Sequence, residues 1–303
     1  MATRTGERGV RTSRLGAAAV LGAVAIWGVV NVLIKVSPLP ALTFAANRLW
    51  MGTGLLLLLG LLTGRRLTWA MVRTSAPGGA LLGVEIAFWF SAVKHTTLAD
   101  AAVISALQPA LVLLAAGPLF GERITARDAW WMALATVGAV LVSVGSSGTP
   151  AWSLYGDLLA GASVFAWTGY FLVSKRARRT VPPLQYMTVV FLVAGLLVTP
   201  LALLAGQPLV GLDRADLVLL AVFVVGASAA HVLLSWAHAS VDVSVSSLLT
   251  LFQPVVAAVA ALLVLGEPIT PLAAAGGAVV IGALAAIVRR AARVGEAEEV
   301  PPV

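Results

Sequence analysis

The sequence predicts an all-α integral membrane protein, with ten transmembrane helices that form two inverted five-helix repeats. Three observations lead to this prediction. Of the 303 residues, 60% are hydrophobic and only 11% are charged. The apolar residues form long runs, and two polar motifs recur at a fixed distance along the chain. A soluble domain of this length could not bury so much apolar surface in one core, so we expect the lipid bilayer to be its solvent.

Ten apolar runs are long enough to cross a hydrocarbon core of about 30 Å, which takes roughly 20 helical residues. The runs are continuous and rich in Ala, Leu and Gly, whereas strands of a membrane β-barrel alternate polar and apolar residues. The expected spans are residues 15–34, 41–62, 76–93, 101–120, 129–147, 154–173, 184–205, 217–237, 243–265 and 272–288. We interpret the first run as a retained helix, because no convincing cleavage site of a signal peptide follows it.

Positive charges are distributed unevenly between the two sides of the predicted membrane. Apart from Arg48, which lies inside a span, only Lys35, Lys94 and Arg214 lie outside the side that holds both termini. Such a bias predicts that both termini are cytoplasmic and that the protein is a multi-pass protein of the cytoplasmic (inner) membrane. It also explains the net charge of +7 without a nucleic-acid partner.

An internal repeat relates the two halves of the chain. Gln108-Pro109 and Gly121-Glu122 recur 145 residues later as Gln253-Pro254 and Gly266-Glu267, while Trp27 and Lys35 recur 140 residues later as Trp167 and Lys175. The pattern predicts one five-helix half at 1–148 and a second at 149–290, followed by a disordered cytoplasmic tail at 291–303. Because five is odd, the second half enters the membrane from the opposite side, an architecture that allows alternating access.

The chain resembles the drug/metabolite transporter superfamily, and within it the ten-helix permeases of the EamA type. The motifs that carry this resemblance are Trp27-Gly28 with Lys35, Asn47-Arg48-Leu49, Lys94-His95, Ser105 to Gln108-Pro109, Gly121-Glu122, Gly156-Asp157-Leu158 and Gly266-Glu267. The resemblance implies solute transport, frequently efflux, of substrates that range from amino acids and nucleosides to drugs.

Two ionisable residues lie deep inside predicted spans. Arg48 and Glu85 are each roughly 12 to 14 Å from the outer end of their helix, at about 1.5 Å per residue. Burying such a group costs about 2.5 to 3.5 kcal/mol, so each requires a reason. One interpretation is a structural ion pair between them, and the other makes Glu85 a site for a proton or a substrate cation. His231 has the same two interpretations, as a packing residue or a titrating group.

Polar and aromatic residues inside the spans are candidates for the wall of a substrate cavity. Besides Arg48, Glu85 and His231, these are Trp27, Asn31, Trp89, Ser105, Gln108, Trp167, Tyr170, Ser247, Thr250 and Gln253. Pro109 and Pro254 are expected to bend their helices at mid-membrane. The alternatives are that Ser and Thr bond their own backbone and that the tryptophans only pack.

Two further patterns have structural interpretations. Small residues at intervals of four in the spans 129–147 and 272–288, including Gly282, predict that the fifth and tenth helices pack together, with a possible homodimer through the same helices. The two Gly-Glu motifs are interpreted as turns whose carboxylates favour the N-terminus of the helix that follows.

The chain has no cysteine, which excludes disulfides and thiolate metal sites, and it contains no catalytic motif of a hydrolase or a metalloprotease. We expect that the protein is not an enzyme, that it has no catalytic residue and that it binds no cofactor or metal. The sequence predicts a secondary transporter of small organic solutes that works as an exporter, with protons as a possible partner. The alternatives are an uptake permease or a facilitative exchanger, and, from other classes, an intramembrane enzyme or a channel.

Overall fold

The computed structural model describes residues 14–96, 98–122, 125–147 and 153–299. Within these residues every regular element is a helix. The elements are α1 (Arg14–Val36), α2 (Ala41–Leu62), α3 (Trp69–His95), α4 (Leu98–Ser105), α5 (Gln108–Phe120), α6 (Ala126–Ser147), α7 (Leu154–Ala177), α8 (Pro183–Leu204), α9 (Arg214–Ala237), α10 (Val243–Leu249), the 3-10 turn η1 (Thr250–Phe252), α11 (Gln253–Leu265) and α12 (Pro271–Glu299). The side chains of Asn31, Lys35 and Lys94 lie outside the described residues.

The predicted membrane character of the bundle is confirmed. In the described part of the chain, eight spans are long and apolar enough to cross a membrane, and α1 contributes a shorter apolar stretch at Leu15–Val30. The helix α3 is not among them, but it is 27 residues long and packs against α7 and α8. With α1 and α3 included, the bundle has the ten spans that the sequence predicts.

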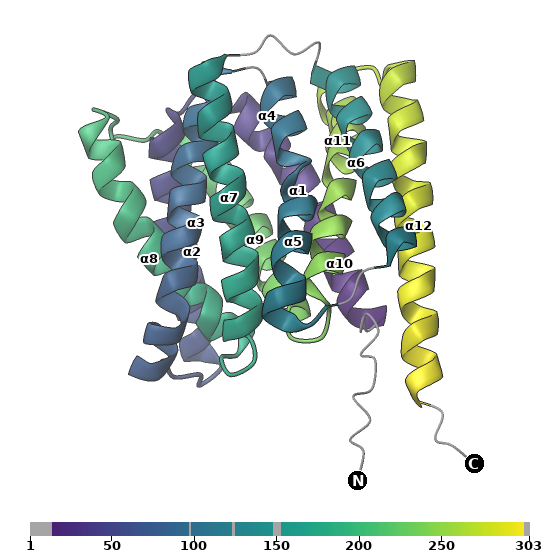
Figure 1. Ribbon diagram of the computed structural model, residues 1–303. Helices are drawn as coiled ribbons and strands as arrows, with labels where there is room; N and C mark the ends of the chain where they lie inside the picture. The colour runs from purple at the N-terminus through teal and green to yellow at the C-terminus, as the bar shows by residue number, and fades with distance from the viewer. Residues whose placement is uncertain (1–13, 97, 123–124, 148–152, 300–303) are drawn as a thin grey trace.

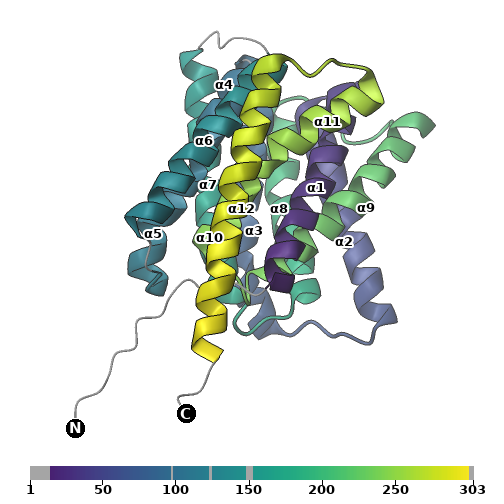
Figure 2. The same cartoon turned by 90° about the vertical axis from the view of Figure 1, so that its right-hand side faces the viewer.

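The helix contacts follow the inverted repeat. The repeat relates α1, α2 and α3 to α7, α8 and α9, relates the α4–α5 span to the α10–α11 span, and relates α6 to α12. The packing of α1 against α9 is therefore matched by α7 against α3, and α1 against α11 by α7 against α5. Two pairs, α2 with α8 and α6 with α12, are related to themselves. Figures 1 and 2 show the resulting bundle, in which α1 begins and α12 ends at the same end. We call this the termini end, and the opposite one the far end.

Two of the ten spans contain a short irregular turn beside the prolines that the sequence singled out. The fourth span is interrupted between Ser105 and Gln108, and the ninth passes through the turn η1 before α11 begins at Gln253. Pro109 and Pro254 lie in the first turn of the second segment, where a proline lacks no helical hydrogen bond. The bends expected at these prolines stay a prediction.

The predicted packing of the fifth and tenth spans is confirmed, but on a different face of α12. A Cβ atom on Gly276 would lie 2.6 Å from the carbonyl oxygen of Gly138, so the two backbones meet directly. Gly282, which the four-residue interval places in the contact, has no neighbour within 4 Å of a Cβ atom and is exposed. The residues in this contact are spaced by three and four positions, because residues at these spacings lie on one face of an α-helix. A homodimer through α6 and α12 stays a prediction.

Two helix ends differ from the sequence prediction. α3 begins at Trp69 instead of residue 76, because the hydroxyl of Thr68 caps it by accepting a hydrogen bond from the backbone N–H of Met71. α12 continues to Glu299, whereas a disordered tail was expected from residue 291. Its last residues are mostly Ala, Arg and Glu, which all favour helix.

The glycine contact between α6 and α12 yields a stability prediction. Gly276→Ala should lower the free energy of unfolding by about 1–3 kcal/mol, because the added methyl group overlaps the backbone of α6. The matched control Gly282→Ala should be neutral or stabilising, since it adds helix propensity without a clash. Thermal unfolding of both variants in detergent measures the difference, and equal melting temperatures would contradict the contact.

Candidate functional site

Aromatic side chains from four helices meet in the middle of the bundle. The ring of Trp27 in α1 lies 5.9 Å from that of its repeat counterpart Trp167 in α7 and 4.8 Å from the imidazole of His231 in α9. Trp167 stacks on Tyr170 at 5.1 Å. His231 also meets the edge of Phe191 in α8, at 5.2 Å. Both halves therefore contribute to one aromatic cluster, which presents flat apolar faces and polar edges.

Arg48 lies beside this cluster with part of its hydrogen-bonding capacity unused. It is 8% exposed, its Nε has no hydrogen-bond partner, and its guanidinium lies 5.8 Å from the centre of the Phe223 ring. The positive charge also acts on His231 and Glu85. A buried guanidinium that keeps an unsatisfied donor is costly, so the side chain is suited to an additional acceptor.

Glu85 lies between Arg48 and α7. Its carboxylate interacts electrostatically with Arg48 and accepts a hydrogen bond from Ser163 in α7. Tyr170 lies close enough to Glu85 to interact with its charge. Arg48 and Glu85, which the sequence suggested could pair, are thus neighbours, and Glu85 also connects to the aromatic cluster.

Six of the predicted site residues, then, lie together: Trp27, Arg48, Glu85, Trp167, Tyr170 and His231. We call these six residues the central cluster. Gln108 is buried with no partner for its Nε2, while Trp89, Ser105 and Gln253 are half-buried. Ser247 and Thr250 donate their hydroxyl protons to backbone carbonyls of their own helical segment, which is the self-bonded arrangement left open above. The side chain of Asn31 is outside the described residues.

At the termini end, Glu122 connects the two halves. Its Oε1 accepts from the backbone N–H of Val243 at 2.9 Å, and its Oε2 accepts from the N–H and the hydroxyl of Ser244 at 3.1 and 2.6 Å. Asp242 occupies the cap position of α10 but makes no capping hydrogen bond with its side chain. The carboxylate from the first half therefore caps a helix of the second half, and not the following helix α6 as the sequence suggested.

A second set of polar contacts supports the same end. The ammonium group of Lys175 donates to the carbonyl of Val241 and lies near Glu122 and Asp242. The Nδ1 atom of His238, the first residue after α9, lies 2.8 Å from the hydroxyl of Ser174. Burial, and then the charges of nearby cations, lower the pKa of His238 to about 3, so its ring is neutral at physiological pH.

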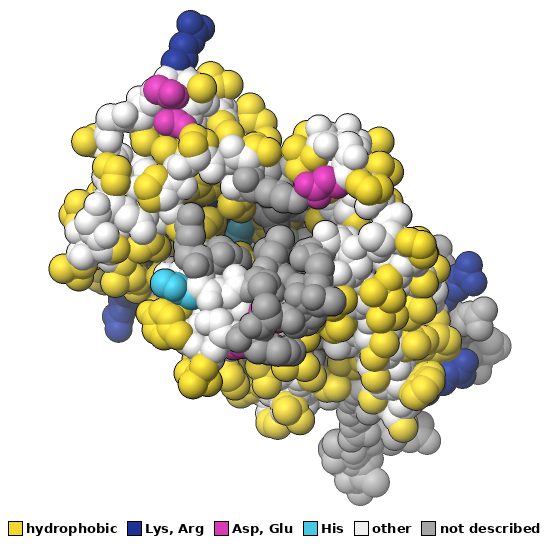
Figure 3. Space-filling view, turned by 90° about the horizontal axis from the view of Figure 1, so that it is seen from above, with side chains coloured by type: hydrophobic (Ala, Val, Ile, Leu, Met, Phe, Trp, Pro, Cys, Tyr) yellow, Lys and Arg dark blue, Asp and Glu magenta, His cyan; other side chains and the backbone are white. Residues whose placement is uncertain are grey.

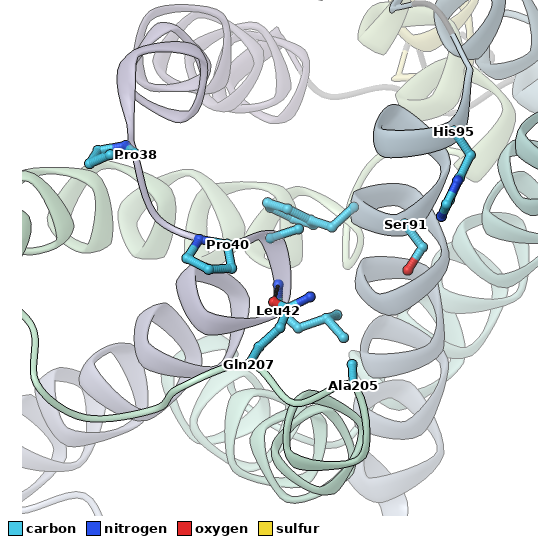
Figure 4. Close-up of a pocket in the computed structure, with 9 residues that line it drawn as sticks. Pro38, Pro40, Leu42, Ser91, His95, Ala205 and Gln207 are labelled. Atoms are coloured by element: carbon cyan, nitrogen blue, oxygen red, sulfur yellow. Dashed lines mark hydrogen bonds between the residues drawn. The ribbon is translucent and has the colours of Figure 1, made fainter.

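The far end, by contrast, holds a cavity of about 490 Å³. Seen from that end, the surface is hollowed (Figure 3). Ser91 and His95 point from α3 toward a space whose other side is formed by Pro40, Leu42 and Gln207 (Figure 4). A cavity of this size is within the range that small organic ligands occupy.

Gln207 joins the halves at the base of this cavity. Its Oε1 accepts from the backbone N–H groups of Leu42 and Thr43, at 2.8 and 3.2 Å. These donors are at the start of α2, where the preceding residue Pro40 offers no side-chain cap. A side chain of the second half thus completes a helix of the first half.

The helix contacts show the same difference between the two ends. At the termini end α10 packs against α5, which brings the halves together. The repeat relates the pair α10 and α5 to the pair α4 and α11 at the far end. Among the described residues, α4 and α11 do not pack against each other to a comparable extent. Instead α4 packs against α6 and α7, and the hydroxyl of Thr96 lies 2.7 Å from the Oδ1 of Asp157 in α7. The two halves therefore pack more closely at the termini end, whereas the far end holds the cavity.

Sequence reasoning missed several contributors to this arrangement. Phe223 and Phe191 have no property in the sequence that separates them from other core residues. Gln207 lies in a connection and belongs to no motif. For Glu122 a signal was present, since the Gly-Glu motif is repeated, but a local interpretation assigned it to the wrong helix.

Chemically, the central cluster offers opposite charges, aromatic faces and hydrogen-bonding groups. No group of three or more His, Cys, Asp or Glu residues that could hold a metal ion is found in the described part of the chain.

The sequence is similar to known transporters along nearly its whole length. The profile of the EamA-like transporter family matches residues 14–144 and again residues 154–289. The transporter YwfM of Bacillus subtilis (strain 168), described as uncharacterized, is 28% identical over 261 residues, which are 83% of this chain and 86% of YwfM. The pseudopaline exporter CntI of Pseudomonas aeruginosa is 30% identical over 142 residues, 46% of this chain and 50% of CntI.

The fold also has a counterpart of known structure. A crystal structure of another protein superposes with a TM-score of 0.81, over 92% of this chain and 98% of that chain. The sequences are 20% identical, so the likeness concerns the fold alone.

The contact between Arg48 and Glu85 yields a second prediction. Glu85→Gln should destabilise the protein because it leaves the buried charge of Arg48 without its counter-charge. Adding Arg48→Met should recover much of the loss, which corresponds to a coupling free energy of about 1–3 kcal/mol. A double-mutant cycle of thermal unfolding in detergent measures this coupling. Strictly additive effects would mean that the two charges do not interact.

Proposed function

Because this chain belongs to the EamA-like transporter family, we propose that it is a secondary transporter that moves small organic solutes across the cytoplasmic membrane by alternating access. The observation that carries the proposal is the difference between the ends. Glu122 and α10 close the termini end, whereas a cavity of about 490 Å³ opens at the far end. The inverted repeat supplies the reverse arrangement, because exchanging the conformations of the halves opens the other end.

The central cluster is the proposed substrate site. Its aromatic rings suit a solute with an apolar or flat portion. Arg48 and Glu85 offer opposite charges to polar groups of the solute, and Arg48 keeps an Nε that can donate to it. The resulting substrate class is a small metabolite, amino acid or drug-like molecule with at least one ionised group.

Two features support export as the direction of transport. The relative CntI is by name an exporter. The uneven distribution of Lys and Arg supports cytoplasmic termini, and the open far end then faces the outside of the cell. In this orientation the structure corresponds to the state that releases an exported solute.

Glu85 is the proposed coupling group, since a carboxylate inside the membrane can exchange a proton for a solute. The test is reconstitution in liposomes with an imposed pH gradient and a trapped pH dye, with a panel of amino acids, nucleosides and aromatic cations. We expect a solute-dependent proton flux that Glu85→Gln abolishes.

The matched control for this experiment is Thr53→Val. Thr53 is buried, and its hydroxyl bonds only the carbonyl of Leu49 in its own helix, so transport should persist. Solute movement without proton flux in the wild type would replace the proposal with facilitative exchange and leave Glu85 a structural residue.

The proposed orientation is tested with single cysteines, since the natural chain has none. Val210 is 83% exposed in the far-end connection between α8 and α9, and Arg66 is exposed in the connection between α2 and α3 at the termini end. In intact cells a membrane-impermeant maleimide should label Val210→Cys at once, but Arg66→Cys only after permeabilisation. The reverse pattern would place the termini outside.

A further inference from the structure

Glu122 holds the two halves together at one end of the molecule, and its motif is repeated at the other end. The carboxylate accepts hydrogen bonds from two backbone N–H groups and one hydroxyl at the start of α10. Such bonds to an ionised acceptor are roughly twice as strong as neutral ones, and the positive end of the helix adds to them. Glu122 is therefore a main polar link between the halves where the path is closed.

The local turn does not explain why a glutamate occupies this position. The following helix α6 already has its own cap, because the backbone N–H of Asp128 donates to the hydroxyl of Thr125 at 3.3 Å and that hydroxyl donates to Asp128 at 2.7 Å. In the second half, Thr270 accepts from the backbone N–H of Ala273 at the start of α12. Neither Gly-Glu motif is needed to start the helix that follows it.

The repeat assigns a matching partner to the second glutamate. At the offset of 145 residues, Glu122 corresponds to Glu267, and the capped residues Val243 and Ser244 correspond to Leu98 and Ala99, the first residues of α4. Glu267 lies at the far end, between α11 and α12, and α4 begins at the same end. In this structure α4 is held against α7 instead, and the far end is open.

We propose that Glu122 and Glu267 are reciprocal gating residues of the transport cycle. In the present state the carboxylate of Glu122 caps α10 and closes the termini end. In the opposite state this cap is released, α4 leaves α7, and the carboxylate of Glu267 accepts hydrogen bonds from the N–H groups of Leu98 and Ala99, which closes the far end. Each cap thus forms in one state only, and the two caps set the equilibrium between the states.

The charges around each cap are compatible with this exchange. At the termini end Lys175 lies near both Glu122 and Asp242. The repeat relates Lys175 to Lys35 at the offset of 140 residues. In the sequence, a lysine therefore accompanies each of the two glutamates.

The absence of cysteine makes the proposal directly measurable, because spin labels can be placed without removing native residues. One labelled pair, Ala126→Cys with Ser240→Cys, spans the halves at the termini end. The repeat-related pair, Pro271→Cys with His95→Cys, spans them at the far end. Pulsed electron resonance on the full-length protein in lipid nanodiscs then reports the distance distribution at each end without any solute.

The two glutamate variants should shift the distances in opposite directions. Glu122→Gln should lengthen the termini-end distance and shorten the far-end distance, with at least about a tenfold change in the ratio of the two states. Glu267→Gln should leave the termini end closed and reduce any population with a closed far end. The double variant should return toward the wild-type ratio, since both caps are weakened.

Several outcomes of this experiment decide whether the two glutamates act as gating residues. Shifts in the same direction, or no shift in either variant, would overturn the proposal and return both glutamates to a role in the turns. The control Thr125→Ala removes the cap of α6 and should not change the ratio. The proposal rests on the proposed alternating access, but its readout is independent of transport: opposite shifts without any solute flux would leave the gate standing and remove the assigned substrates.

Discussion

The constraint on which this structure depends is that backbone polar groups inside a membrane must find partners within the protein. A continuous helix satisfies them by itself. The first N–H groups of each helix, however, have no partner within that helix and must find one elsewhere. At α10 the partner is Glu122, and at the start of α2 it is Gln207. In both cases the acceptor belongs to the other half of the chain.

This arrangement connects local structure to function. A helix end that is capped by the opposite half holds the two halves together, and releasing the cap separates them at the cost of exposed N–H groups. Such a contact is stable enough to define a closed state, yet it is confined to a few hydrogen bonds that can exchange. The contact of α6 with α12, where backbones meet at glycines, joins the two halves at a second place.

The second constraint on this structure is the charge that it buries. Arg48 and Glu85 lie where ionised groups are costly, and the Nε of Arg48 has no hydrogen-bond partner in the protein. A partly satisfied buried charge contributes little to stability, because a packed apolar pair in its place would make the protein at least as stable. It is a suitable device for binding, since a solute with polar groups completes what the protein leaves open.

Much of the fold could be predicted from the sequence, because hydrophobic length and the repeated motifs report directly on spans and symmetry. The central cluster was predicted in part for the same reason: Arg48, Glu85 and His231 are conspicuous in apolar runs. The short turns beside Pro109 and Pro254 could not be located from the sequence, since a proline that starts a helix segment and one that bends a helix have the same local sequence. The partners of Glu122 and Gln207 are more than a hundred residues away, and no local pattern contains that information.

The measurement that tests the central claim most directly is counterflow in liposomes that contain the purified protein and an excess of an unlabelled transported solute. Labelled solute is added outside at low concentration, without any imposed gradient of ions. A carrier with one alternating site exchanges internal for external molecules, so the label should accumulate transiently above its equilibrium level and then decline. Simple equilibration of the label, without the overshoot, would indicate a pore and contradict the account.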